Sequence, residues 1–195
     1  MTARVTVVTP TIATRHAKLD AACASVHAQT FKDWIHLIVP DGPDPSLSTV
    51  HSRTCIIPLG RPHRDSGNSN RLLGCLLVDT PYIAYLDDDN RWRPRYLEVL
   101  VAALDADPSA GFAYAQMEYA DGRILGDGTP GMYRIDTSML LHRVELLDVA
   151  TWDIPCPDPY VMDGLLVDRW LAWGIGFVFV PEVTVDYPQK GCGAP

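Results

Sequence analysis

Hydrophobic and polar positions alternate in short blocks along the first half of the chain, and the blocks have two different periods. Four apolar runs, several of them rich in β-branched residues, predict buried strands. These runs span residues 5–8, 34–39, 54–59 and 82–86. Between and after the runs, apolar residues recur at the three- to four-residue spacing of one helix face. The helical stripes are Leu19, Ala22, Cys23 and Val26, then Leu73, Leu76 and Leu77, and finally Leu97, Leu100, Val101 and Leu104.

This alternation predicts an α/β fold with a mostly parallel central sheet and helices on both faces. The second half is less regular, with strands expected at 112–117, 139–141 and 177–180. A helix is expected from Asp158 to Trp173, because Asp158 is a good N-cap and Pro159 suits the first helical position. With 195 residues the chain has the length of one domain that buries its own core, so we expect a single domain over residues 1–195.

Charge and composition narrow the classes of function. The chain has 24 acidic and 16 basic residues, a formal net charge of −8, so no long-range attraction draws it to nucleic acid or to anionic lipid. No apolar run approaches the length that spans a bilayer, and the first residues lack the apolar block of a secretory leader. The five cysteines show no CxxC spacing and favour reduced thiols. We expect a cytoplasmic protein without a membrane span, for which nucleic acid is not the expected partner.

Three consecutive aspartates, Asp87, Asp88 and Asp89, follow the strand at 82–86 and are the first sign of chemistry. Adjacent carboxylates repel one another, and ligands of open α/β sheets bind at the carboxyl ends of the strands. Asp41 follows the strand at 34–39 and is expected at the same edge. Oxygen ligands of this kind suit a hard cation, so Asp87 and Asp89 are candidate ligands of Mn²⁺ or Mg²⁺. The alternative is a solvated acidic turn before the helix that begins near Pro94.

Several segments of the first half resemble glycosyltransferase family 2, whose members have the GT-A fold, a DXD motif and inverting chemistry. The stretch from Tyr82 to Trp92, with its three aspartates, resembles the segment around the DXD motif. The opening Val-Thr-Val-Val-Thr-Pro-Thr at residues 5–11 resembles the first strand and its turn. Residues 25–31, Ser-Val-His-Ala-Gln-Thr-Phe, resemble the end of the family's first helix. The resemblance implies transfer of a sugar from a nucleoside diphosphate donor to a hydroxyl acceptor.

The resemblance also assigns donor-binding residues. It implies that the turn after the first strand lines the nucleotide base and that Asp41 accepts a hydrogen bond from that base, typically uracil. The "A-R-N-x-G" segment of the family reads Asn-Arg-Leu-Leu-Gly here, so Arg71 matches while Leu72 replaces the usual Asn. The alternative for Arg71 is a surface salt bridge. The donor-binding candidates are therefore Thr9, Pro10, Thr11, Asp41, Arg71, Asp87 and Asp88.

Two candidates in the second half come from a looser resemblance. Residues 160–170 resemble the acidic helix start that supplies the family's catalytic base, although Met162 and Leu165 replace acidic residues, which leaves Asp163 as the candidate base. Its alternative is a favourable charge near a helix N-terminus. Asp186 stands where some members have a metal-binding His, so it is a candidate third metal ligand, with a solvated aspartate in the C-terminal tail as the alternative.

We therefore predict a metal-dependent inverting glycosyltransferase that uses a nucleoside diphosphate sugar, with UDP the expected nucleotide. Residues 1–92 are expected to form the nucleotide-binding half, and residues 93–195 the acceptor-side half. Two alternatives remain open. One is a catalytically inactive module that binds sugar nucleotides or glycans. The other is a nucleotidyltransferase, although the segment from Thr9 to Arg15 lacks the glycines that such an enzyme needs to hold a triphosphate.

Overall fold

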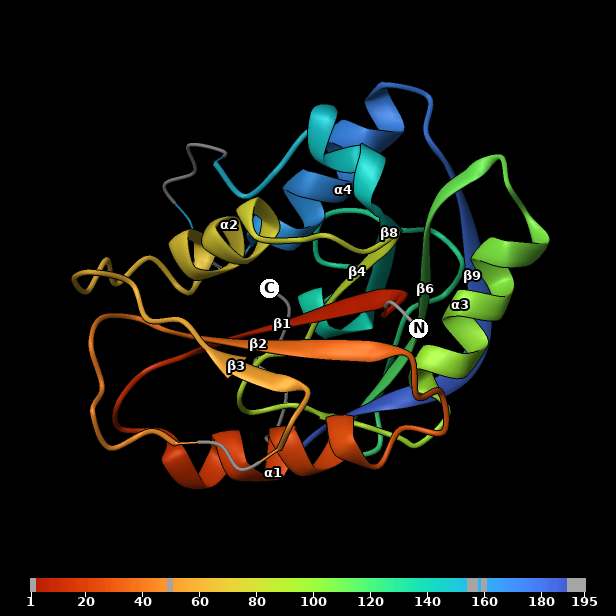
Figure 1. Ribbon diagram of the computed structural model, residues 1–195. Coiled ribbons are helices and arrows are strands. Elements are labelled where there is room, and N and C mark those ends of the chain that lie inside the picture. Colours follow the sequence, from red (N-terminus) through yellow and green to blue (C-terminus); the bar gives the residue numbers. More distant parts are fainter. Residues whose placement is uncertain (1–2, 49–50, 154–157, 159–160, 189–195) are drawn as a thin grey trace.

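A computed structural model describes residues 3–48, 51–153, 158 and 161–188 of the chain. A mixed, curled sheet runs through the molecule in the strand order β3-β2-β1-β4-β8-β6-β9-β5, with the short β7 paired to β6 (Figure 1). The strands are β1 (Val5–Thr11), β2 (Trp34–Pro40), β3 (Thr54–Ile56), β4 (Tyr82–Tyr85), β5 (Arg91–Trp92), β6 (Ala110–Tyr119), β7 (Ile124–Leu125), β8 (Leu140–Arg143) and β9 (Gly176–Tyr187). The helices are α1 (His16–His27), α2 (Asn68–Leu76), α3 (Tyr96–Ala106) and α4 (Met162–Ala172), with the 3₁₀ turns η1 (Thr137–Met139) and η2 (Val144–Asp148).

The first four strands in chain order form the parallel part of the sheet, as the alternating pattern predicts. β1 pairs in parallel with both β2 and β4, so that Val5 lies beside Trp34 on one side and Tyr82 on the other. β3 adds to the outer side of β2, again in parallel. Figure 1 shows α1 on one face of these strands and α2 on the opposite face. This register brings the carboxyl ends of β1, β2 and β4 to one edge of the sheet.

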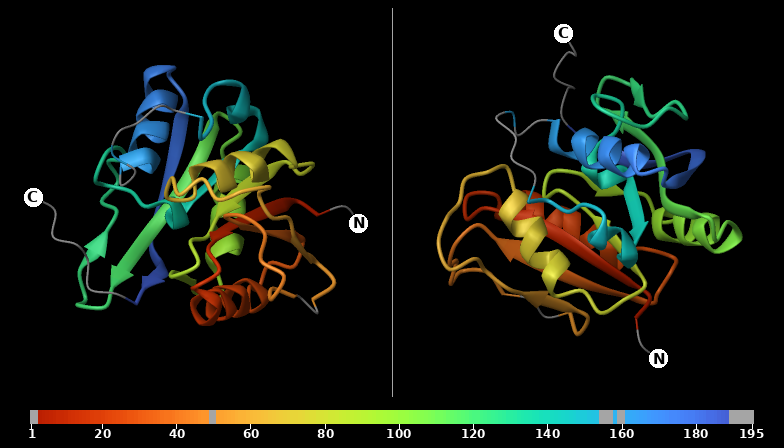
Figure 2. Two further views of the ribbon diagram at one scale, coloured as in Figure 1. Left: turned by 90° about the vertical axis from the view of Figure 1, so that its left-hand side faces the viewer. Right: turned by 90° about the horizontal axis from the view of Figure 1, so that it is seen from above.

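The second half of the sheet is mixed. β8 lies antiparallel between β4 and β6, whereas β6 and β9 pair in parallel over most of their length. β5 closes the far edge, antiparallel to β9. The left view of Figure 2 shows the long strands β6 and β9 together, with α4 alongside them.

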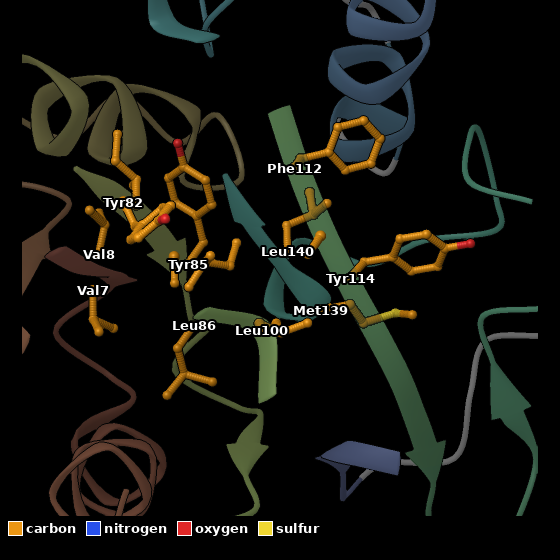
Figure 3. Packing of buried hydrophobic residues seen from close by; sticks show 14 of the residues in the cluster. Val7, Val8, Tyr82, Tyr85, Leu86, Leu100, Phe112, Tyr114, Met139 and Leu140 are labelled. Atoms are coloured by element: carbon orange, nitrogen blue, oxygen red, sulfur yellow. The ribbon is translucent and has the colours of Figure 1, made fainter. Parts of the chain in front are cut away.

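A continuous apolar core lies between the sheet and its helices (Figure 3). Val8 of β1 and Tyr85 of β4 have no exposed surface, and neither do Leu140 of β8 and Leu100 of α3. Gly74 lets α2 approach β1 closely, because a Cβ atom at that position would lie 2.5 Å from Cγ1 of Val8. This packing fixes α2, and the loop before it, against the edge where the strands end.

Two of the differences from the prediction change the placement of candidate site residues. Helix α4 begins at Met162 rather than at Asp158, and it ends at Ala172, next to the expected end at Trp173. Strand β9 continues to Tyr187 instead of stopping near Val180, because register shifts between Ala115 and Met117 of β6 let the pairing with β9 pass Pro181. Asp186 is therefore part of a strand and not of a tail. No helix in the described part of the chain is long and apolar enough to cross a bilayer.

Candidate active site

A pocket of about 540 Å³ opens at the edge where β1, β2 and β4 end. Its walls come from the β1–α1 turn, the loop before α2, the triple aspartate, η1 and the start of α4. Carboxylates dominate the charged lining, and three arginines stand against them. The carboxylates are Asp41, Asp87, Asp88, Asp89, Asp136 and Asp163, and the arginines are Arg15, Arg64 and Arg71. Of the predicted site residues, Thr9 and Asp186 are absent from this lining.

Each of the three consecutive aspartates faces a cation. Asp87 forms an ion pair with Arg71, and Asp88 accepts a hydrogen bond of 2.9 Å from Nη1 of Arg15. Oδ2 of Asp89 lies 3.5 Å from both Nη1 of Arg15 and Nζ of Lys18. The repulsion expected among three adjacent carboxylates is thus offset by positive charge from α1, α2 and the β1–α1 turn.

Asp88 is the buried member of this group, and it explains part of the β1–α1 turn. Its side chain is 3% exposed, and its Oδ2 accepts a hydrogen bond of 2.8 Å from the Thr11 hydroxyl. Burial raises the pKa of Asp88, while the bonds from Thr11 and Arg15 oppose that rise. Thr11 therefore couples the end of β1 to the end of β4. Thr9 lies deeper, where its hydroxyl is 2.8 Å from Nε2 of His36 and the side chain is fully buried.

Arg71 is a pocket residue and not a surface salt-bridge partner. Its side chain is 6% exposed, since α2 packs it against the pocket wall. The guanidinium pairs with Asp87, donates a 3.0 Å hydrogen bond from Nη1 to the carbonyl oxygen of Ser66, and lies 4.9 Å above the ring of Trp152. The nearby carboxylates, Asp87 above all, raise the pKa of Arg71 in spite of its burial.

Asp41 lies in the wall beside the loop that precedes α2. Its Oδ1 accepts a 2.7 Å hydrogen bond from the backbone N–H of His63, and its Oδ2 accepts one of 2.9 Å from the N–H of Arg64. Each carboxylate oxygen keeps a second lone pair, so Asp41 can still accept a bond from a ligand.

Asp163, the predicted base, lines the pocket at the first turn of α4 and is partly buried. Its Oδ2 accepts a 3.1 Å hydrogen bond from the backbone N–H of Thr137, and its Oδ1 accepts one of 2.7 Å from the N–H of Gly164. No ion pair involves it within the described residues. Burial raises the pKa of Asp163 to about 6, and the charge of Asp87 adds to the rise, while the two N–H bonds and Arg71 oppose it.

Asp136 is a pocket carboxylate that the sequence interpretation missed. Its Oδ1 accepts hydrogen bonds from the N–H of Ser138 (2.8 Å) and from Nδ2 of Asn90 (3.3 Å). Burial and the charges of Asp87 and Asp163 raise its pKa to about 8. The sequence signal was Asp136 as the N-cap of a short turn, Asp-Thr-Ser, a pattern too common in loops to indicate a site.

The donor chemistry of the lining fits a hard divalent cation. Mg²⁺ is commonly held by one or two carboxylates together with substrate phosphates and water, and Asp87 and Asp89 both border the pocket. Among the described residues, no group of three or more His, Cys, Asp or Glu side chains is arranged to hold a metal by itself.

Asp186, the expected third ligand, is placed differently from the prediction. It lies in β9 opposite Arg91, and its Oδ1 accepts hydrogen bonds of 2.9 and 2.7 Å from Nε and Nη2 of Arg93. The longer β9 directs this carboxylate to a half-exposed ion pair, while the next residue, Tyr187, lines the pocket. The geometry gives no support to a metal role for Asp186.

Comparisons with known proteins agree with this architecture. The family model described as Glycosyl transferase family 2 matches residues 6–149. The structure of TarS 1-349 from S. aureus superposes with a TM-score of 0.74 at 14% identity, covering 95% of this chain and 60% of that one. The same protein in complex with UDP-GlcNAc gives 0.73 at 14% identity, covering 97% and 60%. The complex with UDP gives 0.71 at 14% identity, covering 94% and 60%.

At this identity the likeness establishes the fold, a mixed α/β domain similar to the GT-A fold. The chain spans about 60% of the 349-residue TarS structure that it matches. No match at a significant level is found among curated proteins.

Proposed function

Because this chain belongs to glycosyl transferase family 2, we propose that it transfers a sugar from a UDP-sugar to a hydroxyl acceptor with inversion. One observation carries the proposal: Asp41, the triple aspartate and the partly buried Asp163 line a single pocket at the carboxyl edge of the sheet. The S. aureus TarS structures in complex with UDP and UDP-GlcNAc support a uridine nucleotide as the donor. In this proposal Asp41 lies at the end of the pocket that receives the base.

The reaction is a direct displacement at the anomeric carbon. The acceptor oxygen forms a bond to that carbon while the bond to the diphosphate oxygen breaks and UDP leaves. Asp163 takes the proton of the attacking hydroxyl. With a pKa of about 6 it is largely ionised at neutral pH and retains enough basicity for the task. The pocket contributes further by holding donor and acceptor in line.

Arg71 and the triple aspartate hold the other end of the donor. Arg71 lies beside Asp87, where it offers a buried positive charge to the diphosphate. Mn²⁺ or Mg²⁺ would be held by Asp87 and Asp89, and when bound it would neutralise the negative charge of the leaving diphosphate. Asp88, bonded to Thr11 and Arg15, keeps the turn after β1 at its place against the donor.

Release of UDP from UDP-sugars tests the proposal, with calorimetry of UDP binding beside it. We expect Mn²⁺ or Mg²⁺ to raise UDP affinity at least about tenfold over the value in EDTA, since the cation offsets repulsion between diphosphate and carboxylates. Asp89→Ala should abolish this gain. Asp79→Ala is the matched control, because Asp79 is an exposed aspartate outside the pocket lining.

The outcomes separate the parts of the proposal. Equal UDP affinity in EDTA and in Mn²⁺ would overturn the role of the metal but leave the proposed sugar transfer standing. Binding of UDP-sugars without any UDP release, across a panel of hydroxyl acceptors, would favour an inactive binding module. Failure to bind any uridine nucleotide would overturn the donor assignment.

A further inference from the structure

The loop between β3 and α2 carries an arginine, Arg64, whose side chain faces no charged partner among the described residues. Of the three arginines that line the pocket, Arg15 pairs with Asp88 and Arg71 pairs with Asp87. Arg64 forms no ion pair or side-chain hydrogen bond within the described part of the chain, although it borders a pocket with six carboxylates. A diphosphate carries more negative charge than Arg71, which already faces Asp87, can offset by itself.

The backbone of this loop is held in an uncommon conformation. Arg64 has a φ of 57° and Ser66 a φ of 59°, both in the left-handed region that residues with a Cβ atom rarely adopt. Such conformations are energetically unfavourable and persist where surrounding contacts fix them, often at functional sites.

Several contacts fix the loop. Both oxygens of Asp41 accept backbone N–H bonds from it, one from His63 and one from Arg64. The Ser66 carbonyl is bonded to Arg71, and Oδ2 of Asp65 accepts a 3.0 Å bond from the N–H of Ser69. The backbone of this loop is thus held by hydrogen bonds, while the side chain of Arg64 is exposed to solvent.

The loop also closes directly on the β1–α1 turn. A Cβ atom at Gly67, which has a φ of 84°, would lie 2.9 Å from Cβ of Pro10. The loop before α2 and the predicted nucleotide-binding turn therefore form one continuous wall of the pocket.

We propose that Arg64 binds the phosphates of the nucleotide donor and that Asp41 is the positioning residue that holds it there. This inference rests on the proposed function and deepens it. The guanidinium offers charge-assisted hydrogen bonds to phosphate oxygens, for which its planar fork is well shaped. Asp41 acts through the backbone of residues 63 and 64, in addition to any bond that it makes to the base.

Calorimetry with UDP and with uridine separates a phosphate contact from a base contact. Arg64→Ala should lower UDP affinity by about tenfold, the equivalent of one charge-assisted hydrogen bond, and leave uridine affinity unchanged. Arg64→Lys, which keeps the charge, should recover part of the loss. Arg61→Ala is the matched control, because Arg61 is an exposed arginine of the same loop outside the pocket lining. Unchanged uridine affinity also shows that the variants keep a folded pocket.

A double-mutant cycle tests the role of Asp41. Asp41→Asn replaces one accepting oxygen by an N–H₂ group that cannot accept a backbone bond, so it should lower UDP affinity in the native chain. In the Arg64→Ala background it should lower UDP affinity much less. Additive losses, with uridine affinity falling in Asp41→Asn, would show that Asp41 acts on the base alone and overturn the positioning role.

Two further outcomes complete the test. UDP affinity unchanged by Arg64→Ala, or lowered equally for UDP and uridine, would overturn the phosphate contact while the proposed function stands. If the native chain binds neither UDP nor UDP-sugars, the proposed function fails and this inference fails with it.

Discussion

The two ends of the pocket treat their carboxylates in opposite ways. At the end formed by the triple aspartate, Asp87, Asp88 and Asp89 all face arginine or lysine side chains. At the end formed by η1 and α4, Asp136 and Asp163 are held by backbone N–H groups and one amide, and no cation pairs with them within the described residues. The first end holds three carboxylates and the second holds two, but only those at the first end are paired with cationic side chains.

The difference shows how one pocket can serve two chemical tasks. The carboxylates that are paired with cations suit the binding of a cation or, for Asp88, the ordering of a turn. Carboxylates that are desolvated without a cation partner have raised pKa values, about 6 for Asp163 and about 8 for Asp136, and can exchange protons near neutral pH. In the proposed mechanism, donor binding belongs to the first end and proton transfer to the second.

The largest effect is expected from removing Arg71, the buried cation at the triple-aspartate end. Arg71→Ala leaves Asp87 without its partner and takes away the contact with Trp152, so the free energy of unfolding should fall by about 3 kcal/mol. Arg95→Ala is the control, since the Arg95 side chain is 56% exposed and its pairs with the exposed Glu98 and the half-exposed Glu182 should contribute less than about 1 kcal/mol. Urea unfolding measures both. Equal losses in the two variants would show that burial of the pair is irrelevant.

Asp163→Asn tests the other end through catalysis. The amide keeps the shape but cannot take a proton, so turnover should fall at least about a hundredfold while UDP affinity stays near its native value. Steady-state rates and calorimetry on the same preparation give both quantities. Asp168→Asn, a change on the same helix outside the pocket lining, should leave turnover unchanged. Near-native turnover of Asp163→Asn would show that Asp163 is not the base and serves only as a favourable charge near the N-terminus of α4.

The dependence of the free energy of unfolding on pH distinguishes the two partly buried carboxyl groups, Asp136 and Asp163. The folded pKa of Asp136 is about 8 against an ordinary value of 3.8, so the folded state binds more protons between these values. Stability therefore falls as pH rises through this window, by at most about 1.4 kcal/mol per pH unit from this group. Asp136→Asn removes that loss. The free energy of unfolding of the variant, relative to that of the native chain, should therefore increase from about pH 4 to about pH 8.

Urea unfolding at pH 5, 6, 7 and 8 checks the slope, because the other titrating groups largely cancel in the difference between variant and native chain. Asp163→Asn provides the comparison. The stability of Asp163→Asn relative to the native chain should stop increasing above about pH 6, the pKa of Asp163. The relative stability of Asp136→Asn should keep increasing up to about pH 8. Parallel curves for the two variants would contradict separate titration of the two groups.

The sequence predicted the parallel half of the fold because each strand and helix there has a clear local period. It also placed Asp41 and the triple aspartate at one edge, since parallel strands carry their carboxyl ends to the same side. The second half was predicted less well. The start of α4 and the length of β9 depend on pairing and packing with distant segments, and local propensity does not encode the register shifts that carry β9 to Tyr187.

What the sequence determined by itself is the α/β order, the family, and the presence of carboxylates where strands end. Which charges meet was decided by the tertiary structure, because partners far apart in the chain come together only when the elements pack. Arg71 reaches Asp87 across the packing of α2 on the sheet, and Asp186 is drawn to Arg93 by the pairing of β9 with β5. Asp136 and Asp163 lie 27 positions apart, and folding η1 against α4 brings both into one desolvated pocket where their pKa values rise.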